Sequence, residues 1–341
     1  MIDKENDGFS FGYLCEAIST NELPSIYKKR RKMSMDILPL IKDNYSFEVK
    51  TQLDDGIIDT NQGRKRYRIW HDEALLNWHQ EWREKCSQNP YQLTDRMLQT
   101  KDKRKAIKVE DGWLTVHDDI IDPYPTKDFE QKWAHFIARM IEIGTTTKDD
   151  WISTDKREFP SASEWKVWVS KTKLLDEKKR KILQSCIQEA MRRKHKALEL
   201  RKKDKEKRLP IMDKVSSTTQ AKKIYELFVW QGTAEAPEYG FVSFTHFLQQ
   251  WVGENGEESL IKLLNEIEEQ IPFRQMYGNE LLAEAWLPWE LVHAMEHLQQ
   301  SEEEEEIEVH FSTFQKEWND RRQLVLTLLN WLKEDRKKVA T

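Results

Sequence analysis

A chain of 341 residues is long enough for two or three domains. Its fourteen Trp, thirteen Phe and nine Tyr residues supply large apolar side chains for a buried core, which excludes a largely disordered protein. The net charge of -5 hides an uneven layout, because residues 171–208 carry a net charge of +10 and residues 209–341 a net charge of -12.

Glycine and cysteine usage narrows the possible chemistry. The glycine-rich phosphate-binding patterns G-x-G-x-x-G and G-x-x-x-x-G-K-S/T do not occur, which argues against reactions driven by ATP or NAD and predicts no cofactor. Cys15, Cys86 and Cys186 are odd in number and form no C-x-x-C pair, so they predict neither a disulfide framework nor a thiolate zinc site. The sequence shows no secretory leader pattern and no apolar run of membrane-spanning length, so we expect a cytoplasmic protein without a membrane partner.

Residues 1–160 have the pattern of a small mixed unit, either α+β or mainly helical. Three stretches have the β-branched and aromatic content of strands: SFEVKTQ (46–52), KRYRIWH (65–71) and DGWLTVHDD (111–119). Two stretches have apolar residues at helical spacing: DEALLNWHQEWREK (72–85) and DFEQKWAHFIARMIEIG (128–144). In the second helix the spacing predicts one buried face, made by Phe129, Trp133, Phe136 and Met140.

Residues 161–210 predict a long, basic amphipathic helix followed by a charged connector. Ser161 and Glu164 form a capping-box pattern at its start. An apolar stripe then runs at steps of three, four or seven through Trp165, Trp168, Leu175, Ile182, Cys186, Ala190 and Ala197. The stripe ends near residue 200, so RKKDKEKR (201–208) is expected to be a connector closed by Pro210.

Residues 211–341 predict an acidic helical domain. Five expected helices are TQAKKIYELFVWQ (219–231), FTHFLQQWV (244–252), EESLIKLLNEIEEQI (257–271), LLAEAWLPWELVHAMEHL (281–298) and FSTFQKEWNDRRQLVLTLLNWLKEDRK (311–337). Between the last two, the repelling glutamates of SEEEEEIEV (301–309) predict an exposed loop.

The basic segment is the strongest candidate for binding. A helix with one apolar stripe and a cationic reverse face can lie along a phosphate backbone, where neutralised phosphates release counterions. The alternative is a solvated helix whose lysines pair with Glu189, Glu199 or the acidic C-terminal domain. The candidate nucleic-acid-binding residues are Lys178, Lys181, Arg192, Arg193, Lys194, Lys196, Arg201, Lys202 and Lys203. Supporting basic patches occur at YKKRRK (27–32) and KDKRK (101–105).

HAMEH (293–297) is the sharpest enzymatic pattern, because it matches the H-x-x-E-H motif of zinc proteases. Two histidines four residues apart lie on one helical face and can share a zinc ion, while Glu296 activates water. The helical phase argues against this role. It places Leu291, Ala294, Met295 and Leu298 on the apolar face, so Glu290, His293 and His297 are expected to face solvent.

Two weaker patterns have residues found in metal-dependent hydrolases. FEVK (47–50) supplies Glu48 and Lys50 on an expected strand, with Asp36 or Asp43 upstream, as in a metal-dependent nuclease. WHD (70–72) and VHDD (116–119) contain His-Asp pairs of the kind used by phosphohydrolases, without further ligands at a recognisable spacing. An exposed strand edge and chance pairs explain these residues more simply.

We therefore expect a mainly α protein, in which a helical C-terminal bundle is joined by a long basic helix to a smaller mixed unit. The expected domains are residues 1–160, 161–210 and 211–341. The predicted function is a non-enzymatic accessory subunit of a nucleic-acid-handling assembly. It would bind DNA or RNA without sequence specificity through the basic helix, and a protein partner through the acidic domain. The alternative is a metal-dependent hydrolase or nuclease using the HAMEH or FEVK residues.

Overall fold

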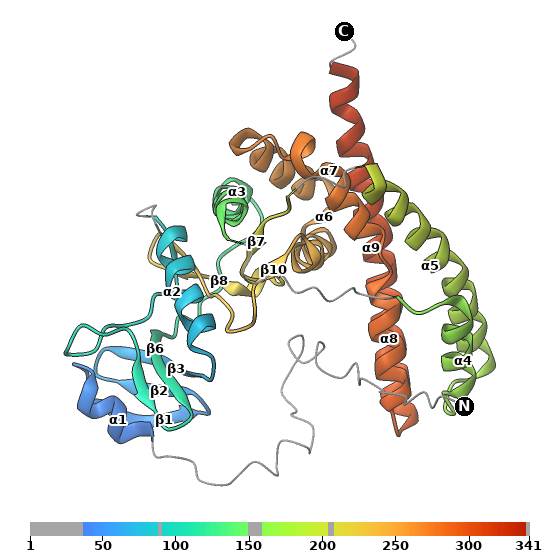
Figure 1. Cartoon of the computed structure of the whole chain (residues 1–341). Helices are drawn as coiled ribbons and strands as arrows, with labels where there is room; N and C mark the ends of the chain where they lie inside the picture. Colours follow the sequence, from blue (N-terminus) through green and yellow to red (C-terminus); the bar gives the residue numbers. More distant parts are fainter. Residues whose placement is uncertain (1–36, 88–90, 149–158, 204–207, 339–341) are drawn as a thin grey trace, which may run out of the picture.

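Five antiparallel strands form a sheet in the order β1-β2-β3-β6-β5 in the computed structural model (Figure 1). The structure describes residues 37–87, 91–148, 159–203 and 208–338. The strands of the sheet are Val49–Asp54 (β1), Ile57–Thr60 (β2), Gly63–Trp70 (β3), Ile107–Val109 (β5) and Gly112–Asp118 (β6). The three stretches expected to be strands fall in β1, β3 and β6, so that prediction is confirmed.

One face of this sheet is covered by the helix α1 (Ile37–Asn44). Ile41 and Tyr45 pack there against Ile58 of β2 and Leu114 of β6, and all four side chains are buried. Along β6, Leu114 and Val116 on this face alternate with Thr115 and His117, which lie on the opposite face. Tyr67 of β3 packs on this face too, so Arg66 and Arg68 point to the opposite face, where they can contact other parts of the chain.

Helix α2 (Glu73–Cys86) follows β3 directly. Asp72 caps it by accepting hydrogen bonds from the backbone N–H groups of Ala74 and Leu75. Its buried face mixes apolar residues such as Leu76 with the polar His79 and Arg83. Buried polar groups need partners, and these partners are Asp95 and the backbone carbonyl oxygens of Thr233 and Glu235.

Two small sheets join the β-rich part to the helices. One sheet has the order β4-β9-β8, with β4 parallel to β9, and the other pairs β7 with β10 in antiparallel fashion. Their strands are Gln92–Thr94 (β4), Ile211–Met212 (β7), Ala221–Ile224 (β8), Leu227–Trp230 (β9) and Glu238–Tyr239 (β10).

The helix expected over 219–231 is therefore wrong, because this segment is the hairpin β8–β9. The chain reverses at Tyr225, which has a positive φ of 52°. β9 then pairs with β4, more than a hundred residues earlier in the chain. Such long-range pairing overrides local helical spacing, since strand propensity depends on cross-strand neighbours.

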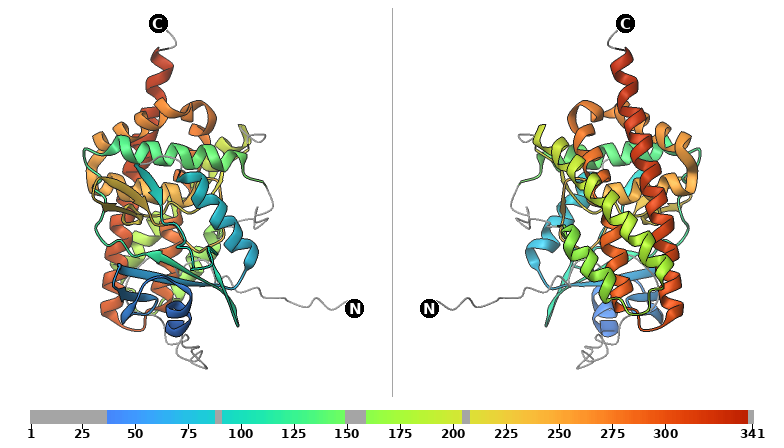
Figure 2. Two further views of the ribbon diagram at one scale, coloured as in Figure 1. Left: turned by 90° about the vertical axis from the view of Figure 1, so that its left-hand side faces the viewer. Right: turned by 90° about the vertical axis from the view of Figure 1, so that its right-hand side faces the viewer.

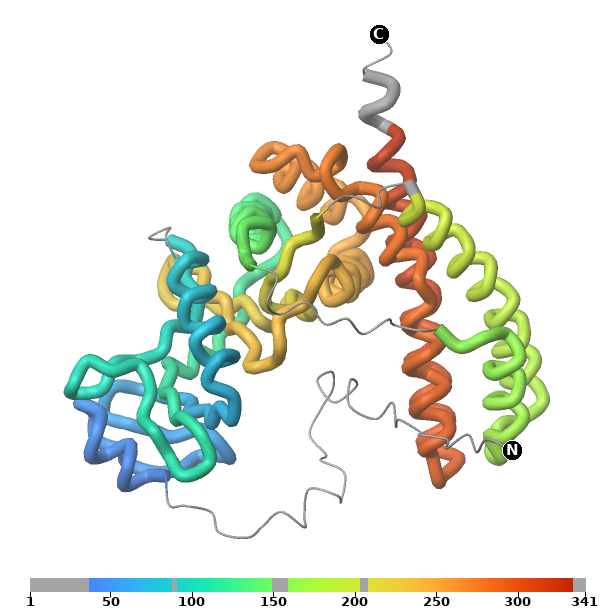
Figure 3. The backbone as a smooth tube through the Cα atoms, in the orientation of Figure 1, coloured from blue at the N-terminus to red at the C-terminus, as the bar shows by residue number. Residues whose placement is uncertain are grey.

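Most of the remaining chain is helical. The bounds are Glu130–Thr146 (α3), Ala162–Lys171 (α4), Glu177–Lys203 (α5), Val242–Gln270 (α6), Phe273–Trp286 (α7), Trp289–Gln300 (α8) and Glu304–Lys338 (α9). The largest buried cluster joins α3, α6, α7 and α9 around Trp133, Phe247, Trp251 and Trp331. Figure 3 traces the backbone from the sheet at one end of the molecule to these helices at the other.

The long basic helix does not connect two units, and the expected fold class is wrong on this point. The segment divides into α4 and α5, which pack against each other, and α5 also contacts α7 and α8 (Figure 2). The capping box of Ser161 and Glu164 at the start of α4 is confirmed. Trp165, Leu175 and Ala190 of the predicted stripe are buried against α8 and α9, so they pack these helices onto the helical lobe. Leu183 and Ile187 are buried there in place of the predicted Ile182 and Cys186, which are only partly buried.

The glutamate run also differs from the expected loop, because Glu304–Glu306 form the first turn of α9. Negative side chains are favourable there, since the free N–H groups of a helix start carry partial positive charge. Among the described residues, no helix combines the length and apolar character that crossing a membrane requires.

Candidate functional site

A buried carboxylate, Asp95, is the centre of a polar cluster between the sheet and the helices. Its Oδ1 accepts hydrogen bonds from Arg83 Nε at 3.0 Å and from the backbone N–H of Gly232 at 2.9 Å. Its Oδ2 accepts from Arg66 Nη2 at 2.6 Å. Burial opposes ionisation, but the attraction of Arg83 and the other cations outweighs it, so the pKa of Asp95 lies well below its usual range.

The topology explains why these residues meet. Asp95 follows β4 and Gly232 comes shortly after β9, and the carboxyl ends of two parallel strands lie at the same edge. Arg66 and Arg68 are two residues apart on β3, so both point to one face of the strand. Arg83 reaches the same point from the buried face of α2.

Arg68 extends the cluster toward the loop after β9. Its Nη2 donates to the carbonyl oxygen of Gly232 at 3.0 Å, whereas its Nη1 is enclosed and has no hydrogen-bond partner. Nε of Arg66 is likewise enclosed without a partner. Burial and the neighbouring Arg66 lower the pKa of Arg68 to about 10, which leaves it charged at neutral pH.

A second buried carboxylate, Asp213, directly follows β7. It accepts hydrogen bonds from the backbone N–H and the hydroxyl of Thr233 and from the backbone N–H of Lys214. Gly232 separates it from the arginines. A Cβ atom at this glycine would lie 2.6 Å from Asp213 Oδ2 and 2.7 Å from Arg83 Nη2, so only glycine fits between the two groups.

Two neutral histidines complete the cluster. His79 Nε2 donates to the carbonyl oxygen of Glu235 at 2.8 Å, and His117 Nε2 lies 3.0 Å from the hydroxyl of Thr115. Burial lowers the pKa of His79 to about 4 and that of His117 to about 3. Both rings are therefore uncharged at neutral pH, and they add no positive charge to the arginines.

The cluster carries an excess of positive charge. Three guanidinium groups, of Arg66, Arg68 and Arg83, face the two carboxylates of Asp95 and Asp213. Two of the guanidinium donors are unpartnered. An enclosed donor without an acceptor is costly, so the arrangement favours a negatively charged ligand.

The histidines predict a loss of stability in acid. The unfolded chain takes up protons near pH 6.5 at His79 and His117, whereas the folded chain resists protonation until about pH 4 and pH 3. Stability is therefore lost as the pH falls below 6.5. Between pH 7 and pH 5 we expect these two residues to lower the free energy of unfolding by roughly 3–4 kcal/mol.

Urea unfolding at pH 7, 6 and 5 measures this change. The double variant His79→Gln/His117→Gln should show a flatter pH dependence, and an unchanged slope would contradict the assignment.

The nine basic residues expected to bind nucleic acid lie on α5, and none of them belongs to this cluster. Several are engaged within the fold. Arg193 is buried and donates through Nη1 to Glu290 at 2.5 Å, and Arg201 pairs with Glu284 and, at 3.6 Å, with Glu280. Part of this positive charge is therefore paired with glutamates inside the helical lobe.

The other basic residues of α5 have varied surroundings. Lys194 Nζ donates to the carbonyl oxygen of Phe159 at 3.0 Å, and Lys196 Nζ lies 4.5 Å from the centre of the Trp286 ring. Lys181 pairs with Glu177 at 3.3 Å on the surface. Lys178, Arg192 and Lys202 are exposed, and Lys203 ends the helix with its side chain outside the described residues. The patch at 27–32 also lies outside them.

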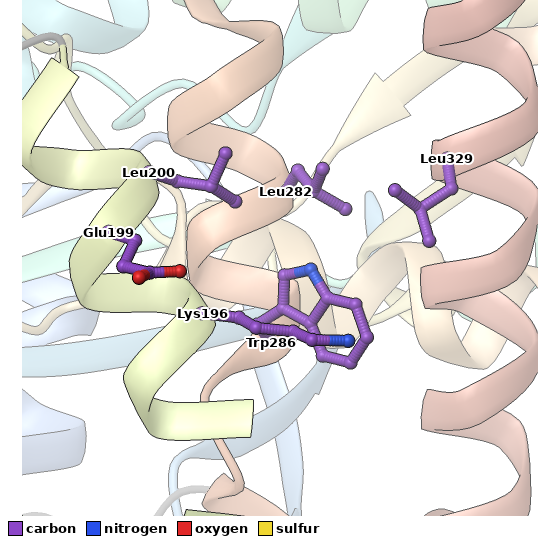
Figure 4. A pocket seen from close by; sticks show the side chains of 6 residues that line it. All are labelled: Lys196, Glu199, Leu200, Leu282, Trp286 and Leu329. Carbon is purple, nitrogen blue, oxygen red and sulfur yellow. The ribbon is translucent and has the colours of Figure 1, made fainter. Parts of the chain in front are cut away.

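A hollow of about 240 Å³ lies beside Lys196, between α5, α7 and α9 (Figure 4). Its walls combine one aromatic ring, three leucines, an ammonium group and a carboxylate. The residues are Lys196, Glu199, Leu200, Leu282, Trp286 and Leu329. The ammonium group of Lys196 already lies over the Trp286 ring, so this basic residue forms part of the wall of the hollow.

The HAMEH residues are placed partly as expected. Leu291, Met295 and Leu298 are buried, which confirms the predicted apolar face. His297 is exposed as predicted. His293 was expected on the surface but is half-buried, with its ring 5.8 Å from that of His246.

Glu290, also expected to face solvent, is almost completely buried because it binds Arg193. The part of the chain that the structure describes contains no group of three His, Cys, Asp or Glu side chains placed to hold a metal ion.

The remaining hydrolase patterns have local structural partners. Lys50 lies 3.6 Å from Asp59 on the neighbouring strand. Asp118 and Asp119 of VHDD pair with Lys65 and Arg64. Asp72 of WHD caps α2. These residues therefore stabilise the sheet and its helix.

Solved structures of low sequence identity share the overall fold of this chain. An aminoglycoside phosphotransferase from Alicyclobacillus acidocaldarius matches with a TM-score of 0.64 and 11% identity, over 89% of this chain and 99% of the other. The chain has a phosphotransferase fold. A spectinomycin phosphotransferase in complex with ADP and spectinomycin matches with a TM-score of 0.53 and 10% identity, over 89% and 99%. A microcompartment-associated aminopropanol kinase matches with a TM-score of 0.52 and 10% identity, over 84% and 99%. No protein-family model and no curated protein matches the chain.

The phosphotransferase fold overturns two interpretations of the sequence. The chain is not a helical bundle with a spacer helix, because a sheet lobe and a helical lobe meet at the Asp95 cluster. The prediction of a non-enzymatic accessory subunit is also wrong, since the matching proteins are phosphotransferases and kinases.

Sequence reasoning did not identify the cluster residues as a site. The only available signal was KRYRIWH, where Arg66 and Arg68 alternate on an expected strand and therefore share one face. Asp95, Asp213 and Gly232 come from three separate segments, and none belongs to a recognisable motif. Their proximity depends on the parallel pairing of β4 with β9.

Phosphoryl-transfer enzymes commonly neutralise phosphate with magnesium bound by carboxylates. The donor set of this cluster does not fit such a cation. Asp95 and Asp213 already accept three hydrogen bonds each, and three arginines lie beside Asp95. Gln231, the residue after β9, has a neutral amide that donates to the carbonyl oxygen of Ile120 at 2.9 Å. It therefore supplies no carboxylate for a cation.

Proposed function

We propose that the protein is a phosphotransferase that moves a phosphoryl group from a phosphoanhydride, such as a nucleoside triphosphate, to a hydroxyl group of a small cationic molecule. The main support is the excess of positive charge on Arg66, Arg68 and Arg83 directly beside the buried carboxylate of Asp213. Gly232 brings these groups together, since it leaves no space for a side chain between Asp213 and Arg83. The phosphotransferase fold supports the same reaction class.

The proposed step assigns separate roles to these side chains. Asp213 accepts the proton of the acceptor hydroxyl, whose oxygen forms a new bond to the terminal phosphorus. The bond between that phosphorus and the bridging oxygen breaks, and the leaving phosphate takes the electron pair. The arginines neutralise the charge that spreads over the phosphate oxygens in the transition state.

Charge favours a cationic acceptor. Residues 209–341, which include Asp213 and helices α6 to α9, carry a net charge of -12. A negative field of this kind attracts cations and raises their rate of association. The matching phosphotransferases act, by their names, on spectinomycin, aminoglycosides and aminopropanol. We therefore propose an amino alcohol or an aminocyclitol as the acceptor.

Phosphorus NMR of ATP mixed with the protein and one candidate acceptor tests this function. We expect ADP and a new phosphate monoester with spectinomycin or aminopropanol, and slower transfer to the uncharged control glycerol. Each mixture is prepared with magnesium and with EDTA. Binding of ATP without transfer to any of the acceptors, in either condition, would contradict the proposed reaction.

A further inference from the structure

The arginines of the cluster come from two elements and share few acceptors. Arg83 on α2 and Arg66 on β3 both bind Asp95, and Arg68 binds only a backbone carbonyl. One positive charge therefore remains in excess, in a region where most side chains are buried. Low polarity strengthens the attraction between this charge and an anion.

Two donors of the cluster have no acceptor within the described part of the fold. Arg68 Nη1 and Arg66 Nε are enclosed and have no hydrogen-bond partner. The side chain of Arg66 is 18% exposed, so the cluster is open to solvent at this residue. A phosphate group has several acceptor oxygens, and guanidinium groups bind such groups in a fixed geometry.

The same residues that favour an anion are unfavourable for a divalent cation. Both oxygens of Asp95 accept hydrogen bonds, and so do both oxygens of Asp213. Each carboxylate therefore accepts three hydrogen bonds and has about one lone pair left, fewer than a carboxylate that binds a metal through both oxygens requires. The three arginines would also repel a cation at this position.

We propose that the protein binds the terminal phosphates of its donor without a divalent metal, because Arg66 and Arg68 replace the cation. The inference rests on the proposed function, since it concerns the same phosphate donor. It distinguishes this site from phosphoryl-transfer sites that bind magnesium with carboxylates. The ligand is recognised by its phosphates, so inorganic tripolyphosphate should compete with ATP, whereas adenosine should not.

Isothermal titration of the full chain with ATP, in magnesium and in EDTA, tests the inference. We expect the affinity in EDTA to equal or exceed that in magnesium, since free ATP carries more negative charge than its magnesium complex. Arg68→Met should weaken binding about tenfold or more, the usual effect of losing a charged hydrogen bond. Arg64→Met is the matched control. It lies on the same strand, but it pairs with Asp119 outside the cluster, so it should leave the affinity unchanged.

The outcomes separate this inference from the proposed function. Binding that requires magnesium and still depends on Arg68 would overturn the inference and leave the proposed function standing. Failure of ATP and tripolyphosphate to bind in either buffer would overturn both. Arg68→Lys keeps the charge but loses the planar donor pair, so it should bind more weakly than the native protein and more tightly than Arg68→Met. Circular dichroism verifies that each variant is folded.

Discussion

Replacing Asp95 with alanine should lower the free energy of unfolding by about 3–5 kcal/mol. The variant removes the carboxylate that binds Arg83 and Arg66, while the side chain of Arg83 is only 3% exposed. An uncompensated guanidinium would then be buried beside Arg68. Chemical unfolding at pH 7, followed by tryptophan fluorescence, measures the loss.

Two controls isolate the effect of the buried charge. Asp102 binds Arg104 at the surface, where both side chains are more than half exposed, so Asp102→Ala should cost less than about 1 kcal/mol. Asp95→Ala/Arg83→Met removes the carboxylate together with one of the buried charges, and it should recover part of the lost stability. If Asp95→Ala were as stable as Asp102→Ala, Asp95 would not hold the two lobes together.

Replacing Asp213 with asparagine should lower kcat by about 10²–10⁴, the range expected when a general base is removed. An amide cannot accept the proton of the acceptor hydroxyl. Binding of ATP should change little, because the phosphate-binding arginines remain. Initial rates of phosphate transfer and titration with ATP separate the two effects.

Asp122→Asn is the matched control for this variant, because the side chain of Asp122 is exposed on the segment between the sheet and α3. It should retain the native kcat. Near-native transfer by Asp213→Asn would exclude Asp213 as the proton acceptor and would require a different base. A loss of ATP binding equal to the loss of rate would instead place Asp213 in the binding site.

The local pattern of the sequence predicted much of the secondary structure correctly. Helix α3 buries Trp133, Phe136 and Met140 as its spacing requires, and the capping box starts α4 at the predicted residue. Phe129, predicted on the same buried face, instead precedes the helix and is exposed. Three strands of the main sheet coincide with stretches rich in β-branched and aromatic residues. These features depend on neighbours within a few positions, which one sequence contains in full.

The charge pattern of α5 was a weaker guide. The sequence assigns Arg193 and Arg201 to a cationic surface, but their partners Glu290 and Glu284 lie about ninety residues later in the chain. Helical phase also placed Glu290 and His293 on the solvent side of α8. Packing of α5, α6 and α9 around that helix covers more of its surface than a single apolar stripe predicts.

The sequence alone determined the helices and strands with strong local periodicity, the aromatic core and the uneven distribution of charge. Tertiary structure decided that 219–231 is a hairpin, that α5 belongs to the helical lobe, and that a candidate active site exists. Asp95, Asp213 and Gly232 converge only when β4 pairs with β9 and β7 pairs with β10. Such pairings join segments more than twenty residues apart, and their free energy comes from contacts that no local pattern encodes.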